Sequence, residues 1–390
     1  MPETHEYLVP DYYPSFHCKM GACRSACCEG WPVSMSMQDY FHLLGVQCRG
    51  ELRAKLDCAL HLVKYPTPER YAQIEHRYDG NCPMRLEDGR CALHAELGED
   101  ALPYICRLYP RAVRAEGDYE CSCAGSCEAT IELLFAQEEP IRFIRRTLTF
   151  ELPRSPERSV FFESFSREQA LRLYLIGLMQ DRSLPLPRRM LRLGAAMAEA
   201  EEALSAQDSA RIDRLIRGET VLEVPEPSSE VRLEDLRSGL LVMEKFTEQL
   251  DERSDSIRAI GQDALGYFGR DEGTMNRYQA ARAHFDQIAP RWPVYLENML
   301  VNHMFFSRFP FADEHESLRG EFVSFCMVYA LLRFLGVGHL ASQSDESALV
   351  DLAAAAFRLI DHSAFHRYSA RMLRDLGYDT PERLFTLINL

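Results

Sequence analysis

Residues 16–31, FHCKMGACRSACCEGW, bring four cysteines together in one short, loop-like stretch. Thiolates spaced a few residues apart can converge on one soft metal centre from a single loop. Zinc, copper(I) and iron–sulfur clusters prefer such ligands over hard oxygen donors. The stretch therefore predicts that the amino-terminal part of the chain is a metal-binding module, whose irregular loops take their geometry from the metal.

Two further cysteine clusters follow. The second lies in residues 80–111, GNCPMRLEDGRCALHAELGEDALPYICRLYPR, and the third in residues 121–127, CSCAGSC. Four thiolates complete a [4Fe–4S] or a zinc site, so ten predict either two centres or some bystanders. His94, close to the second cluster, is a further candidate ligand. The predicted metal ligands are Cys18, Cys23, Cys27, Cys28, Cys82, Cys91, Cys106, Cys121, Cys123 and Cys127.

The cysteine spacings leave the kind of metal open. Zinc ribbons carry paired C-x2-C knuckles and ferredoxins carry C-x2-C-x2-C runs, and neither pattern occurs here. A [4Fe–4S] cluster is the expectation, and zinc is the alternative. Cys48, Cys58 and Cys326 lie on apolar faces of expected helices, so these three are predicted to be core residues.

Composition excludes several classes of protein. The formal net charge of −15 over 390 residues argues against a nucleic-acid surface and mildly favours a basic partner. The first residues lack the charged start and apolar run of a secretory signal, and no apolar stretch is long enough to span a membrane. The expected location is therefore the cytoplasm. In that reducing compartment 13 cysteines indicate metal binding rather than disulfides.

The cysteine distribution also predicts the domain organisation. All but Cys326 lie before residue 128, so residues 1–130 are expected to form the cysteine-rich module and residues 131–390 an all-helical bundle with a polar loop at about 218–232. The fold class is mainly α, because no series of short alternating strands is readable. Apolar periodicity predicts helices at 37–62, 128–150, 167–179, 187–206, 233–250, 257–268, 276–306, 318–335, 346–360, 364–376 and after 380.

The cysteine pattern resembles a known family. F-x-C-x4-C-x3-C-C, followed by D-G-x-C-P, G-R-C-x-L-H and C-R-x-Y-P-R, is similar to the CxxCxxCC zinc- or iron-chelating module. The whole chain resembles the flagellin lysine-N-methylase family. That resemblance rests on the P-D-Y and C-C-x-G-W opening and on an E-N-x-L-x-N…F-P-F segment, here residues 295–311, YLENMLVNHMFFSRFPF.

The resemblance implies methyl transfer from S-adenosylmethionine to lysine ε-amines of flagellin, with a [4Fe–4S] cluster involved. The chain departs from two common patterns for binding S-adenosylmethionine. It has no G-x-G motif following a strand, and it lacks the radical C-x3-C-x2-C signature. Two rival functions stay open: a metal-chelating or metal-delivery protein without catalysis, and a redox or structural module in which metal only holds the loops.

Two amides lie on one face of an expected helix. Asn298 and Asn302 are four residues apart in an apolar stripe, and buried amides need partners. They are predicted to line a cofactor site; the alternative is a hydrogen bond between helices. A lysine methylase must also deprotonate its substrate, but no catalytic residue can be assigned from the sequence. The candidates for the base are Asp11, Tyr12, Tyr109, Tyr295 and Glu297.

Overall fold

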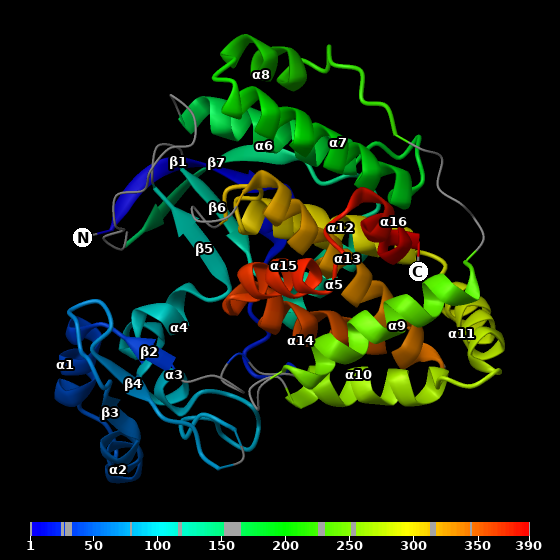
Figure 1. Ribbon diagram of the computed structural model, residues 1–390. Coiled ribbons are helices and arrows are strands. Elements are labelled where there is room, and N and C mark those ends of the chain that lie inside the picture. Colours follow the sequence, from blue (N-terminus) through cyan, green and yellow to red (C-terminus); the bar gives the residue numbers. More distant parts are fainter. Residues whose placement is uncertain are drawn as a thin grey trace.

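The computed structural model describes residues 2–24, 27, 33–78, 80–115, 119–151, 165–224, 231–250, 255–312, 317–343 and 345–389. Helices dominate these residues, so the predicted mainly α fold is confirmed. Figure 1 shows a small module at the lower left, a sheet at the upper left and a large helical body beside them.

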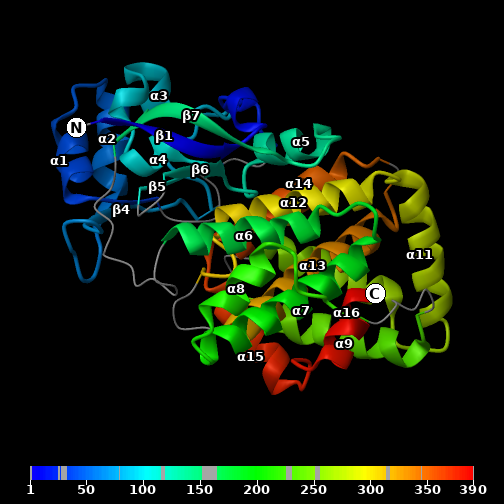
Figure 2. The ribbon, with the colours of Figure 1, turned by 90° about the horizontal axis from the view of Figure 1, so that it is seen from above.

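The larger sheet has four strands in the order β5-β6-β1-β7. β1 (Glu3–Pro10) pairs along its full length with β7 (Phe143–Phe150) in the antiparallel sense and runs parallel to β6 (Glu120–Cys123). β5 (Arg111–Arg114) forms an antiparallel pair with β6 at the edge. The end of β1 is buried, because Tyr7 and Val9 belong to the same hydrophobic core as the helical body. The sheet is therefore anchored to the helices (Figure 2).

The small module has its own buried cluster, built by three short strands and the helices beside them. Its sheet has the order β2-β4-β3, with both pairs antiparallel. Leu43, Leu56 and Ile74 lie at the centre of that cluster and are almost fully buried. The elements of the module and of the segment leading to β5 are β2 (Val33–Met35), α1 (Met37–Gly45), α2 (Gly50–Ala59), β3 (Leu60–Leu62), β4 (Ala72–Ile74), α3 (Ala92–Leu97), η2 (Glu99–Ala101) and α4 (Tyr104–Leu108); a short η1 (Tyr13–Ser15) follows β1.

The helical body is organised around α13. This helix is long and apolar enough to cross a membrane by length and composition, with a mean hydropathy of 1.6, yet 83% of the apolar window is buried inside the protein. It packs against α7, α10, α11, α14, α15 and α16. The body consists of α5 (Glu128–Ala136), α6 (Phe165–Met179), α7 (Leu186–Ser205), α8 (Ser209–Ile216), α9 (Leu233–Glu248), α10 (Asp255–Phe268), α11 (Thr274–Ile288), α12 (Trp292–Phe306), α13 (Leu318–Leu340), α14 (Ala348–His362), α15 (Phe365–Asp375) and α16 (Pro381–Asn389).

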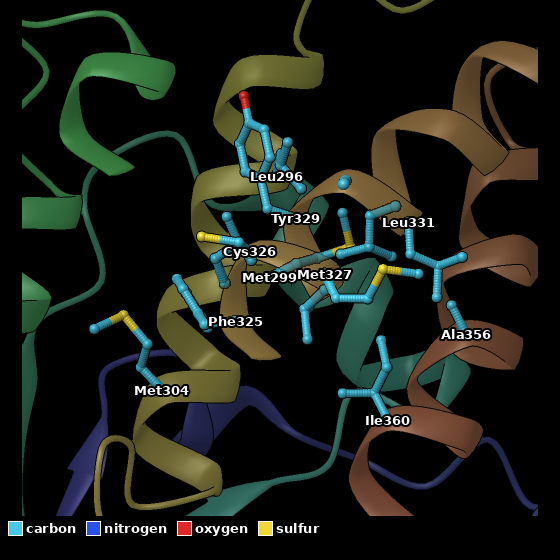
Figure 3. Packing of buried hydrophobic residues seen from close by; sticks show 14 of the residues in the cluster. Leu296, Met299, Met304, Phe325, Cys326, Met327, Tyr329, Leu331, Ala356 and Ile360 are labelled. Carbon is cyan, nitrogen blue, oxygen red and sulfur yellow. The ribbon is translucent and has the colours of Figure 1, made fainter. Parts of the chain in front are cut away.

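The close packing of α12, α13 and α14 is visible in Figure 3, where buried side chains from the three helices meet. Cys326 is among them and is fully buried, which confirms the prediction that it is a core residue. The side chains labelled there are Leu296, Met299, Met304, Phe325, Cys326, Met327, Tyr329, Leu331, Ala356 and Ile360.

Three predicted helices are wrong in extent. The predicted helix 128–150 ends as α5 at Ala136, and its second half is β7, because pairing with β1 outweighs local helical periodicity. The predicted helix 276–306 is divided into α11 and α12 around Pro290 and Pro293. Pro293 lies in the first turn of α12, a position that suits proline because the backbone N–H that it lacks has no partner there. The predicted helix 37–62 is divided into α1, α2 and β3.

The prediction of irregular loops in the first third is also only partly correct. The described residues there form a three-stranded sheet and contribute three strands to the four-stranded sheet. The strands were not predicted because β2–β6 are only three or four residues long and β1 pairs with β6 and β7, which are distant in sequence. The expected polar loop begins after α8 as predicted, but residues 225–230 lie outside the described residues. The domain boundary at residue 130 stays a prediction.

Candidate functional site

Residues 121–127 lead from β6 of the four-stranded sheet into α5. Cys123 ends β6, and Cys127 occupies the N-cap position of α5. The backbone N–H of Ala124 donates to the carbonyl of Pro110 at 2.8 Å, which holds the turn against the end of the neighbouring strand. Gly125 lies so close to Phe357 that a Cβ atom would come within 2.7 Å of the phenylalanine ring. This explains the glycine in the CSCAGSC motif.

Two of the predicted ligands in this segment are buried strand residues. Cys121 and Cys123 have no exposed surface. Burial raises the pKa of Cys121 to about 11, and burial together with Cys121 raises the pKa of Cys123 well above its usual value. Both thiols therefore stay protonated at neutral pH without a metal. A metal ion would have to displace those protons.

Ion pairs and a hydrogen bond hold the segment of the first cysteine cluster against α5. Lys19 forms ion pairs with Glu128 and, at 2.8 Å, with Glu132. The backbone N–H of Arg24 donates to Glu128 at 2.8 Å, and its guanidinium pairs with Asp351 on α14 at 2.9 Å. These contacts bring the predicted ligands of the first cluster to the end of α5 that carries Cys127.

The thiols at this end of α5 are close enough to affect one another. Burial, together with the carboxylate of Glu128 and the neighbouring thiols of Cys127 and Cys18, raises the pKa of Cys23 to about 11. Burial raises the pKa of Cys127 as well, with a smaller contribution from Cys18. The structure thus brings Cys18 and Cys23 of the first cysteine cluster close to Cys127 of the third, although more than 100 residues separate them in sequence.

The second cysteine cluster lies in the small module. Cys82 is buried, and Cys91 and Cys106 pack against the same hydrophobic cluster. Cys91 pairs with Arg85 through an isolated β-bridge, and the carbonyl of Cys82 accepts the N–H of Arg85 at 3.0 Å. Cys106 lies in α4. These three predicted ligands therefore belong to a different buried cluster from Cys121 and Cys123.

The described residues do not by themselves form a closed metal site. Among them, no group of three or more histidine, cysteine, aspartate or glutamate side chains is arranged to hold one ion. Cys28, a predicted ligand, lies outside the described residues. The donor chemistry of the cysteines suits a thiolate-bound metal, although the described residues alone do not converge on one ion.

Of the other two expected core cysteines, Cys58 contradicts the prediction and Cys48, which packs against the buried cluster of the small module, confirms it in part. Cys58 is exposed, so its assignment to the core is wrong; α2 turns this side chain away from Leu52 and Leu56. Cys48 is half-buried and lies between α1 and α2 rather than on a helical face. The sequence could not show this, because the helix expected at 37–62 is broken there.

Asn298 and Asn302 hold α12 against the segments before it. The amide of Asn298 donates to the carbonyls of Leu134 and Gln137, both at 2.9 Å, at the end of α5. The amide of Asn302 donates to the carbonyl of Cys123 at 3.0 Å, and its oxygen accepts from the hydroxyl of Tyr12. Both side chains thus join helix to neighbouring backbone. A cofactor-binding role for either residue stays a prediction.

Four of the five candidate bases are engaged in structural contacts. Tyr12 is buried and donates its hydroxyl to Asn302. Glu297 is buried between Arg182 and Arg189 on neighbouring segments. Asp11 pairs with Arg142 at 3.3 Å. Tyr295 stacks on Phe135 with ring centres 4.1 Å apart.

Tyr109 differs from these, because it lies in a chain of polar groups that reaches the surface. Its hydroxyl is 3.0 Å from Ser126 Oγ, and Ser126 Oγ is 2.7 Å from His362 Nε2. Burial, followed by the nearby thiols of Cys127 and Cys27, raises the pKa of Tyr109 well above its usual value. His362 is exposed in part, yet desolvation lowers its pKa. At neutral pH the site therefore holds a tyrosine hydroxyl and a neutral imidazole.

Asp361 links the turn that carries Ser126 to helix α12. Its Oδ2 accepts the backbone N–H of Gly125 at 3.0 Å, and its Oδ1 is 2.8 Å from Nδ1 of His303 on α12. His303 and the Asp361 carboxylate are almost completely buried. The ring of His303 also stacks on His366 with centres 5.1 Å apart. Three separate elements, α12, α14 and the turn before α5, are thereby held together by polar contacts.

Ser126, His303, Asp361 and His362 were not identified from the sequence. Two of them had a weak signal, since Ser126 lies inside CSCAGSC and His303 inside the segment 295–311. Asp361 and His362 end an apolar helix and had no local signal. Only the tertiary packing of α14 against the turn places them at the site.

A surface cavity of about 660 Å³ lies elsewhere, between α7 and residues 220–224. Arg188 and Arg192 line it, but none of the cysteines, amides or site residues above do. It therefore gives no support for a cofactor site at Asn298 or Asn302.

Sequence comparisons agree on one family. Residues 172–387, more than half of the chain, match the model of the FliB lysine N-methylase C-terminal domain. Lysine-N-methylases from Salmonella choleraesuis SC-B67 and Salmonella typhimurium LT2 are each 28% identical over 103 residues, which is 26% of this chain and 25% of theirs. The flagellar biosynthetic protein FliU of Salmonella muenchen is 27% identical over 103 residues, 60% of its length.

These alignments span only a quarter of the two lysine-N-methylases. No solved structure matches the chain significantly. The match to the family model covers more of the chain than these alignments do. It includes α12, which carries His303, and α14, which carries Asp361 and His362. This protein belongs to the FliB lysine N-methylase family.

Proposed function

We propose that this protein transfers methyl groups from S-adenosylmethionine to lysine side chains of a protein substrate, and that the substrate is flagellin. The reaction would take place in the cytoplasm, before flagellin is exported. The family assignment is the observation that carries the proposal. The printed name of the FliU relative, a flagellar biosynthetic protein, supports a flagellar substrate.

The geometry of the candidate site is consistent with this chemistry. A lysine ammonium has no lone pair, so a methylase must hold and deprotonate it. Helix α14, which lies inside the residues that match the family model, supplies Asp361 and His362, and the cysteine-rich segment supplies Ser126 and Tyr109. The two parts of the chain thus meet where polar groups reach the surface.

Methyl transfer is tested directly with purified protein, purified flagellin and S-adenosylmethionine carrying a labelled methyl group. The expected result is label in flagellin, with methylated lysines located by mass spectrometry. Flagellin whose lysines have been acetylated beforehand is the matched control and should stay unlabelled. Absence of label in untreated flagellin under anaerobic and aerobic conditions would contradict the proposal.

A [4Fe–4S] cluster held by the cysteine-rich segment is a second part of the proposal, with zinc as the alternative. The number of thiols and their soft donor chemistry support it. The thiols around the start of α5 and those of the small module are the ligands to be tested. Iron, acid-labile sulfide and zinc analysis of anaerobically purified protein distinguishes the two metals; stoichiometric zinc without sulfide would rule out the cluster.

Binding of S-adenosylmethionine separates the enzyme from a protein that only chelates or delivers metal. A methylase should bind S-adenosylmethionine in calorimetry, whereas a carrier should not. If metal is removed without loss of methyl transfer, the metal only holds the loops. These two measurements decide between the proposed function and its rivals.

A further inference from the structure

The hydroxyls of Tyr109 and Ser126 and the imidazole of His362 form a continuous chain of hydrogen-bonding groups. The two steps are 3.0 Å and 2.7 Å long. One end lies near the thiols of Cys27 and Cys127, and the other is the partly exposed ring of His362. A chain of this kind can move a proton between a bound ligand and a surface histidine.

We propose that Tyr109, Ser126 and His362 are the proton-accepting site for the lysine ammonium of the substrate, with Ser126 as the relay and His362 as the acceptor. This inference rests on the proposed methylase function and assigns its catalytic base. Tyr109 donates to Ser126 Oγ, and the Ser126 hydroxyl donates to Nε2 of His362. The lone pairs of the two oxygens hold the ammonium.

The proton and electron movements balance. The ammonium gives one proton to Ser126 Oγ while the Ser126 proton passes to His362 Nε2. The freed lone pair on nitrogen then forms the bond to the methyl carbon of S-adenosylmethionine. The carbon–sulfur bond breaks and its electron pair stays on sulfur, which gives S-adenosylhomocysteine. The product is the methylated ammonium, and His362 releases its proton to water.

The charges around His362 suit an acceptor. Burial lowers its pKa, Arg358 on the same helix lowers it further, and Asp361 opposes both. Tyr109 faces the ring from the opposite element at a centre distance of 6.2 Å and stays uncharged, because burial raises its own pKa. The imidazole is therefore neutral and able to take a proton at pH 7.

Asp361 and His303 are positioning residues for this site. Asp361 fixes the N–H of Gly125, the residue before Ser126, and is itself the residue before His362. One carboxylate therefore sets both partners of the 2.7 Å contact. His303 holds that carboxylate from α12 at 2.8 Å.

The test compares the wild-type protein with His362→Gln, Ser126→Ala and the control His284→Gln. His284 is a half-buried histidine whose ring is 2.9 Å from the carbonyl oxygen of Gln343, away from the site. Methyl transfer to flagellin is measured as a function of pH. The first two variants should lose roughly 100-fold or more in kcat/KM. They should also lose the fall in rate at low pH, whereas His284→Gln should keep both.

A second readout needs no methyl donor. In the wild-type protein, NMR of the His362 ring should give a pKa below about 6.5, and Ser126→Ala should raise it, because a hydrogen bond to neutral Nε2 is lost. A wild-type pKa above about 8 overturns the inference, because the imidazole would then already carry its proton at neutral pH, even if a variant fails to fold.

The outcomes separate the two proposals. If the wild-type protein methylates flagellin but His362→Gln and Ser126→Ala match His284→Gln, the inference is wrong and the proposed function stands. If the wild-type protein transfers no methyl group, both are wrong.

Discussion

The backbone N–H of Gly125 donates to Oδ2 of Asp361 over 3.0 Å, across 236 residues of sequence. The next residue in each segment makes a contact of its own, Ser126 with His362 at 2.7 Å. Two consecutive pairs thus join the cysteine-rich segment to α14. Any change that displaces the turn from the helix should therefore disturb the candidate site and the core together.

Replacing Gly125 with alanine tests this close approach. The new Cβ would come within 2.7 Å of the Phe357 ring, which is itself buried in the core. Overpacking of this kind costs about 1–3 kcal/mol. The free energy of unfolding of Gly125→Ala, measured by denaturant titration, should fall by that amount.

Gly177→Ala is the matched control for this variant. Gly177 lies within α6 with nothing within 4 Å of its missing Cβ. An alanine there should raise stability by roughly 0.5–1 kcal/mol, because glycine is a poor helix former. Equal effects of the two substitutions would contradict the close packing of the turn on Phe357.

A buried ion pair should contribute strongly to stability. Glu120 in β6 accepts from Arg172 of α6 at 2.8 and 3.0 Å, and Arg114 lies 3.8 Å away. Glu120→Gln leaves both guanidinium groups without a carboxylate, so the free energy of unfolding should fall by about 3–5 kcal/mol. The exposed pair of Arg217 and Glu219 offers the control, since Glu219→Gln should leave stability unchanged.

The same carboxylate gives a pH dependence with a defined sign. Desolvation raises the pKa of Glu120, but Arg172 and Arg114 outweigh it and the net pKa is lowered. A lowered folded-state pKa contributes stability above the unfolded value of about 4.3 that is lost as pH falls through the folded value. Unfolding curves from about pH 6 downwards should therefore converge for wild type and Glu120→Gln. A constant difference between them would contradict the assignment.

The helical part of the fold could be predicted from the sequence because its signals are local. Helices α6, α7, α9, α10 and α13–α16 follow the apolar periodicity closely. β7 could not be predicted, since its eight residues gain their structure from pairing with β1 at the far end of the chain. The break between α11 and α12 was readable from two prolines but was outweighed by the long apolar run.

The candidate site was less predictable than the fold. The cysteine clusters predicted that residues far apart would meet, and the structure brings Cys18 and Cys23 to Cys127. Tyr109 was one of several possible bases, with no means of choosing it. What distinguishes it is its contact with Ser126 and, through it, with His362. Contacts of this kind depend on how helices pack, which no short motif contains.

The role of Asn298 can be separated from cofactor binding. Asn298→Ala removes the donors to the carbonyls of Leu134 and Gln137 and leaves them buried without these partners. Such a loss costs about 1–3 kcal/mol. The expected result is a lower unfolding temperature with an unchanged dissociation constant for S-adenosylmethionine. A large loss of affinity in a fully folded variant would instead support the predicted cofactor role.

The last prediction concerns the metal ligands. A serine at a true ligand position offers a hard, protonated oxygen where a soft metal needs a thiolate. Cys127→Ser and Cys106→Ser, at the start of α5 and in α4, should therefore lose iron and methyl transfer together. Anaerobic purification with iron and sulfide analysis measures the first property, and labelled flagellin the second.

Two cysteines outside the clusters provide the controls. Cys58 is exposed on α2, so Cys58→Ser should change neither metal content nor stability. Cys326 is fully buried in α13, where a poorly paired hydroxyl costs about 1–3 kcal/mol; Cys326→Ser should therefore be less stable but keep its iron. If Cys326→Ser loses iron while Cys127→Ser and Cys106→Ser retain it, the division into ligands and core thiols is wrong. Loss of stability without loss of iron at Cys326, and loss of iron together with methyl transfer at Cys127, would show that the two kinds of thiol serve separate purposes.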